Sequence, residues 1–137
     1  MFSIALLCLL PVIAAYNPLR APCGLSYEEG QAYKTYANRV KPGLIASCNL
    51  FGDAQAAVET GYEPNLEDGM KFWVTKSIPY DGTSRFVRVL KKVLEQMPTN
   101  VDGRVKTYGC GYSLEYTPSE TKFIVGCLFS RKTYYYG

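Results

Sequence analysis

Two cysteines in two neighbouring apolar runs constrain the fold of this chain more than any other feature. Residues 108–130 read YGCGYSLEYTPSETKFIVGCLFS, with Cys110 in the first run and Cys127 in the second. Both runs are rich in strand-forming residues, and a polar segment with a proline separates them. We therefore expect an antiparallel hairpin that brings Cys110 and Cys127 close enough to form a disulfide.

The N-terminus, MFSIALLCLLPVIAA, predicts a cleaved secretory signal over residues 1–15. Its apolar run is too short for a membrane span, which needs about 20 apolar residues. Cleavage after Ala14 or Ala15 would remove Cys8 with the signal. The remaining residues 16–137 are predicted to form a single domain that is secreted and extracellular, without membrane insertion.

Four cysteines would remain, and an even number in a small secreted chain indicates disulfides. Four cysteines allow three connectivities. The hairpin favours Cys110–Cys127, which leaves Cys23–Cys48 as the second pair, although a crossed pattern stays open. A zinc site would need closely spaced cysteine pairs or histidines, and the sequence has neither.

The complete absence of histidine excludes several classes of enzyme. A Ser-His-Asp or Cys-His centre and an HExxH zinc site all require imidazole. Carboxylate chemistry remains, but the acidic residues lie in polar contexts that suggest helix caps and surface; they are Glu28, Glu29, Asp53, Glu67 and Asp68. We therefore predict no catalytic residue, cofactor or metal, and a net charge of +3 is too small to indicate nucleic-acid binding.

Three stretches are predicted to be helical. In residues 26–40, Ser26 and Glu29 form a capping-box pattern ahead of an apolar stripe. Residues 65–76 predict a second, short helix, and residues 84–97 predict the clearest one. The apolar face of the last helix is formed by Phe86, Leu90, Val93, Leu94 and Met97.

Strands are expected at residues 104–116 and 121–129. Gly109 and Gly111 flank the cysteine of the first strand and indicate a bulge or a close backbone approach. Because amphipathic helices bury their apolar stripes against a sheet, helices followed by a hairpin predict a layered α+β fold.

The connecting segments carry weaker signals. Residues 44–51 are short and apolar and do not decide between a strand and another structure. Residues 52–64 are expected to form a loop with at most one helical turn, and residues 78–84 a turn. Residues 133–137, TYYYG, are read as a last strand or a tail.

The order of several short segments resembles that of the CAP superfamily (SCP/TAPS domains), especially small excretory/secretory proteins of parasitic nematodes. LSYEEGQAYKTYANRV at 25–40 is similar to the family's early helix, and GMKFWVTK at 69–76 to its W-W-x-E-L helix. LEQM at 94–97, YGCG at 108–111 and IVGCLFSRKTYYYG at 124–137 are similar to its G-H-F-T-Q-M, G-C-G and V-V-C-x-Y segments.

This resemblance implies a layered α-β-α sandwich with an antiparallel sheet over residues 16–137, and a disulfide between Cys110 and Cys127. It does not imply the family's divalent-metal cleft. Val93 stands where the family's G-H-F-T-Q-M histidine would be, and the family's earlier histidine has no counterpart.

We expect a non-enzymatic protein that binds a host or extracellular partner, either a protein or a lipid. The candidate partner surface consists of Arg85, Arg88, Lys92, Tyr134, Tyr135 and Tyr136. The simpler interpretation of the basic residues is the solvated face of a helix packed on a sheet. A cystatin-like protease inhibitor is the alternative, although the Q-x-V-x-G loop is absent, and a carboxylate-dependent hydrolase is a third.

Overall fold

The computed structural model describes residues 23–66, 70–75, 78–80 and 85–133. The predicted signal with Cys8, the residues Glu67 and Asp68, and the tyrosines Tyr134 to Tyr136 lie outside the described residues. The elements in chain order are α2 (Tyr27–Val40), β1 (Ile45–Ala46), α3 (Cys48–Thr60), β2 (Met70–Val74), β3 (Ile78–Tyr80), α4 (Phe86–Glu95), β4 (Thr107–Tyr116) and β5 (Thr121–Ser130).

The sheet is built around the predicted hairpin of β4 and β5, whose strands pair antiparallel along their whole length. The strand order is β1-β4-β5-β2, with β3 also pairing with β5. The expectation of an antiparallel sheet is wrong at one edge, because β1 pairs parallel with β4. Ile45 N–H donates to the Lys106 carbonyl at 3.0 Å, and Ser47 N–H donates to the Tyr108 carbonyl at 2.9 Å.

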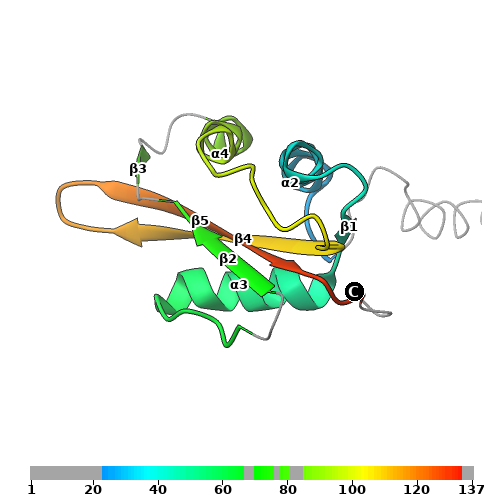
Figure 1. The fold of residues 1–137 in the computed structure, drawn as a ribbon. Coiled ribbons are helices and arrows are strands. Elements are labelled where there is room, and N and C mark those ends of the chain that lie inside the picture. The colour runs from blue at the N-terminus through cyan, green and yellow to red at the C-terminus, as the bar shows by residue number, and fades with distance from the viewer. Residues whose placement is uncertain (1–22, 67–69, 76–77, 81–84, 134–137) are drawn as a thin grey trace, which may run out of the picture.

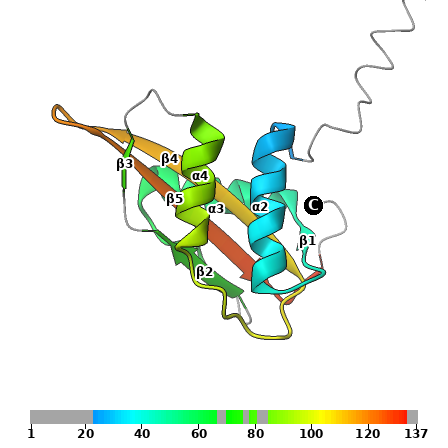
Figure 2. The same cartoon turned by 90° about the horizontal axis from the view of Figure 1, so that it is seen from above.

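Helices lie on both faces of the sheet, so the described chain is an α+β protein in layers. Figure 1 shows α2 and α4 on one face and α3 on the other, and Figure 2 shows α2 and α4 side by side above the hairpin. Alternation along β5 divides its side chains between the two layers. Phe123, Val125, Cys127 and Phe129 belong to the core under α2 and α4, whereas Leu128 packs with residues of α3.

The first and last predicted helices are confirmed. The Ser26 side chain caps α2 by accepting a hydrogen bond from Glu29 N–H at 3.2 Å. Tyr33, Tyr36 and Ala37 are buried from α2, as its apolar stripe predicts. In α4, Leu90 and Leu94 are buried on the sheet side.

Residues 44–51, which the sequence left undecided, contain the strand β1 and the start of α3, and α3 also replaces most of the loop expected at residues 52–64. Ser47 begins the helix, since its side chain accepts from Leu50 N–H at 3.4 Å, and Gly61 ends it in the left-handed region with φ of 76°. Its buried stripe has helical spacing but contains small residues, so the amphipathic pattern is weak in the sequence. The stripe consists of Leu50, Phe51, Ala54, Ala57 and Val58.

Helix α3 lies very close to the backbone of β4. A Cβ added at Gly109 would lie 2.2 Å from Phe51 N, and one added at Gly111 would lie 2.5 Å from Gln55 Cα. The close backbone approach predicted from these two glycines is therefore confirmed. The Gln55 side chain completes the contact, donating to the Tyr112 carbonyl at 2.7 Å and accepting from Tyr112 N–H at 3.0 Å.

The second predicted helix, at residues 65–76, is wrong, because residues 70–74 form the strand β2. This strand pairs antiparallel with β5, from Met70 opposite Ser130 to Val74 opposite Gly126. Its side chains alternate between the layers: Phe72 packs with the α3 cluster and Trp73 with the core on the other face. The expected turn at residues 78–84 begins instead with the strand β3, and residues 81–84 lie outside the described part.

Two disulfides link the pairs that the sequence favoured. Cys23 and Cys48 are joined with their Cα atoms 5.1 Å apart, which ties the entry of α2 to the start of α3. Cys110 and Cys127 are joined directly across the hairpin, where they are register partners.

The hydrogen bonds of Tyr112 show which kind of antiparallel pair the second disulfide joins. Tyr112 directs its N–H and C=O toward Gln55, away from β5. By alternation, Cys110 therefore faces Cys127 in a non-hydrogen-bonded pair, the closer of the two antiparallel spacings.

Candidate functional site

The outer face of α4 carries a cluster of cationic side chains that the fold holds in place. Val89, Leu90, Val93 and Leu94 of α4 are buried. This stripe fixes the rotation of the helix, because turning it would expose apolar area worth about 25 cal/mol per Å². The opposite positions are exposed and basic, and we call them the α4 basic face: Arg85, Arg88, Lys91 and Lys92.

Three of these four cations form no ion pair with a described residue. Arg85, at the N-cap of α4, forms an ion pair with Glu28 of α2 at 3.3 Å. Both side chains are largely exposed, so the pair contributes little to stability. Arg88, Lys91 and Lys92 form no ion pair or hydrogen bond with a described residue, so their charges are available to a partner.

The α4 basic face borders a shallow groove between α2 and α4. The groove has a volume of about 660 Å³, and α2 contributes Tyr27, Glu28 and Gln31 to its lining. From α4, the basic face and the carboxylate of Glu95 line it. Four cations against two carboxylates give the groove a positive character, and the ring of Tyr27, which is 43% exposed, adds an apolar contact.

The sequence reading placed Arg85, Arg88 and Lys92 on the partner surface, and the structure brings these three together on one exposed face. Lys91 was missed, although it follows Arg88 by three residues, a spacing that places two helical side chains on neighbouring turns of one face. Tyr134, Tyr135 and Tyr136 lie outside the described residues, so the structure does not bear on their part in this surface.

The described acidic residues that were weighed for carboxylate chemistry are dispersed. Glu28 pairs with Arg85, Glu29 lies in the first turn of α2, and Asp53 is exposed on α3. Within the described ranges, no three His, Cys, Asp or Glu side chains are grouped so that they could hold a metal ion. None of the helices in these ranges combines the length and apolar character needed to cross a membrane.

No protein-family model matches the chain, and a search of curated proteins finds no match. The CAP resemblance therefore stays a prediction. Val93, at the position of the family's histidine, is 0% exposed and directed into the core, so this position does not contribute to the surface of the molecule.

Proposed function

We propose that this chain is a secreted, non-enzymatic binding protein of the CAP type that recognises an acidic extracellular protein through the α4 basic face. One observation carries the proposal: Arg88, Lys91 and Lys92 are unpaired within the described chain and are presented by a helix whose rotation the core fixes. Such a rigid cationic surface is suited to attracting a surface of opposite charge and orienting it.

The secreted, extracellular location is supported by the predicted signal over residues 1–15 and by the two disulfides, which persist in oxidising compartments. The non-enzymatic role is supported by the absence of histidine from the whole sequence. The α-β-α layering of the CAP type is supported by helices on both faces of the hairpin. The cystatin-like alternative combines a single helix with a sheet, whereas the described part of this chain has three helices.

The test compares two triple variants of equal charge. The first, Arg88→Ala/Lys91→Ala/Lys92→Ala, removes the unpaired cations of the α4 basic face. The second, Lys34→Ala/Arg39→Ala/Lys106→Ala, removes three exposed cations elsewhere and changes the net charge equally. Titration calorimetry with poly-L-glutamate, a defined acidic polypeptide, measures binding at low and at physiological ionic strength.

We expect the wild type and the second variant to bind with an affinity that falls as salt rises, and the first variant to bind about tenfold more weakly or worse. Equal losses in both variants would show that only net charge matters and would overturn the proposal, as would no binding by the wild type at low salt. Binding to phosphatidylserine vesicles but not to poly-L-glutamate would replace the protein partner with a lipid. Inhibition of papain by both variants would favour the protease inhibitor.

A further inference from the structure

A second hollow, separate from the α4 basic face, lies at the edge of the sheet beside β2. It has a volume of about 440 Å³ and is bounded by β2, by the segment between α4 and β4, and by Arg131 just after β5. Pockets that hold small molecules typically measure about 300–1,000 Å³. The polar side chains that line it are Lys71, Asn100, Asp102 and Arg131.

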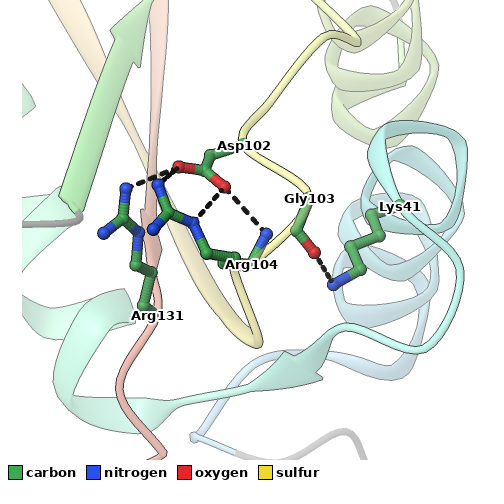
Figure 3. Close-up of polar contacts among 5 residues, drawn as sticks. All are labelled: Lys41, Asp102, Gly103, Arg104 and Arg131. Atoms are coloured by element: carbon green, nitrogen blue, oxygen red, sulfur yellow. Dashed lines mark hydrogen bonds and ion pairs between the residues drawn. The ribbon is translucent and has the colours of Figure 1, made fainter.

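Asp102, the one carboxylate in the lining, is already occupied by donors. It accepts hydrogen bonds from Arg104 N–H at 2.9 Å, from Arg104 Nε at 3.1 Å and from Arg104 Nη2 at 3.0 Å. A fourth comes from Arg131 Nη2 at 2.5 Å (Figure 3). A carboxylate has about four lone-pair sites. The hydrogen bonds from Arg104 and Arg131 also hold the pKa of Asp102 well below its usual range, so it stays ionised and satisfied.

The cations of the pocket, in contrast, keep unused donors. Among the described residues, Arg131 donates only to Asp102, although a guanidinium has five N–H groups. Its Nε is buried and has no hydrogen-bond partner among the described residues. Lys71 is exposed and makes no hydrogen bond or ion pair with a described residue. The polar capacity that remains is therefore dominated by charged donors, which suit an acceptor-rich anion.

Strand geometry brings the two cations to an apolar wall. Lys71 is the register partner of Phe129, so Lys71, Trp73 and Phe129 share one face of the sheet, and the ring centroids of Trp73 and Phe129 are 5.0 Å apart. Arg131 follows Phe129 by two residues. Diagonal neighbours on antiparallel strands lie about 7–8 Å apart, a gap that one carboxylate or phosphate can bridge. Trp73 and Val101 line the pocket beside these cations.

We propose that this pocket binds an organic anion, in which a carboxylate or phosphate group is bound by Lys71 and Arg131 and a small apolar body lies against Trp73. Lys71 supplies a point charge, whereas the Arg131 guanidinium supplies directed hydrogen bonds. Asp102 holds Arg131 in place. Because Asp102 is also paired with Arg104, its negative charge repels the anion only weakly. The ligand contacts no residue of the α4 basic face.

Trp73 is the single tryptophan of the chain, so its fluorescence reports on this pocket alone. The probes are 3-phenylpropionate and phenyl phosphate, with 3-phenylpropanol as the uncharged counterpart and inorganic phosphate as the headgroup without a body. The full oxidised protein is titrated with each probe, and calorimetry provides a second readout. The variants are Lys71→Met, which keeps the apolar stem, and Arg131→Lys, with Lys34→Met on α2 as the matched control.

We expect saturable binding of at least one aromatic anion with Kd of about 1 mM or tighter, and binding of 3-phenylpropanol about tenfold weaker. Lys71→Met should weaken anion binding about tenfold, and Lys34→Met should not change it. Preference for phenyl phosphate or for 3-phenylpropionate assigns the headgroup, and either supports the proposal. If Arg131→Lys fails to fold, Lys71→Met decides.

Three results would overturn the proposal. The first is no saturable signal up to about 10 mM of either aromatic anion. The second is equal affinity for the acid and the alcohol, or for the wild type and Lys71→Met. The third is binding of inorganic phosphate as tight as that of phenyl phosphate, which would remove the organic body from the site.

Discussion

Two buried tyrosines of α2, one turn apart, end in opposite hydrogen-bonding situations. The Tyr36 hydroxyl donates to the Pro98 carbonyl at 2.6 Å. The Tyr33 hydroxyl is buried and has no hydrogen-bond partner among the described residues. Both side chains are at most 2% exposed, so water does not compensate for a missing partner through the surface. A buried polar group without a partner costs about 1–3 kcal/mol.

The same substitution at these two positions should therefore have opposite effects on the free energy of unfolding. Tyr33→Phe removes an unpaired hydroxyl and should raise it by about 1 kcal/mol or more. Tyr36→Phe removes the hydrogen bond to the Pro98 carbonyl, so it should lower the free energy of unfolding by about 1 kcal/mol. Guanidinium unfolding of both variants provides the measurement. A loss of stability of the same size in both would mean that Tyr33 is hydrogen-bonded in solution.

At the scale of elements, the sequence predicted α2, α4 and the hairpin because each has a strong local pattern. The capping box of α2, the basic-apolar division of α4 and the β-branched runs of the hairpin are all contained in the segments themselves. Helix α3 was missed because alanines weaken its apolar stripe and Gly52 lowers its helix propensity. Close contact with the glycines of β4 stabilises it. Strand β2 was read as a helix because pairing with β5 overrides its local preference.

The two candidate sites likewise differ in whether a single segment of the sequence contains their signal. The α4 basic face could be located from one helix, because its charges and its apolar stripe lie in a single segment. The β2 pocket could not, because its cations come from β2 and from the end of β5, which the sequence separates by about 60 residues. Nothing local to Lys71 or Arg131 indicates that the two are neighbours, and only the register of the sheet brings them together.

The close contact between α3 and β4 can be tested by substituting alanine at two glycines, one inside the contact and one outside it. A Cβ at Gly109 would lie 2.2 Å from Phe51 N and 2.3 Å from Leu50 C, both backbone atoms, so the helix itself would have to move. Gly109→Ala should lower the free energy of unfolding by about 2 kcal/mol or more. Gly103→Ala meets no atom within 4 Å and should change it by less than about 0.5 kcal/mol. Denaturant midpoints that coincide for the two variants would contradict this contact.

At the scale of the whole molecule, buried tyrosines make the fold sensitive to alkali. Burial raises the pKa of Tyr108 to about 12, and burial also raises the pKa values of Tyr33 and Tyr36 above their ordinary 10.0. Above pH 10 the unfolded chain loses these protons first, so it binds fewer protons than the folded chain. Stability is therefore fully present below pH 10 and falls as pH rises above it.

We expect the free energy of unfolding to decrease between about pH 10 and pH 11 by up to about 1.4 kcal/mol per pH unit for each such tyrosine. Guanidinium unfolding at several pH values measures the slope. Tyr33→Phe should make the slope shallower, and because the variant differs from the wild type in one group, lysine titration cancels in the comparison. Identical slopes in the two proteins would rule out Tyr33 as a source of the alkaline sensitivity.

The two disulfides also determine how the chain responds to proteolytic cleavage. They close separate loops, from Cys23 to Cys48 and from Cys110 to Cys127. Neither disulfide links the part of the chain before residue 49 to the part after residue 109. A single cut inside either closed loop leaves one covalently connected molecule. A single cut at the exposed residues Gly61 to Glu63 would instead yield two fragments held together only by non-covalent contacts, with α2 and α3 in one and α4 and the hairpin in the other.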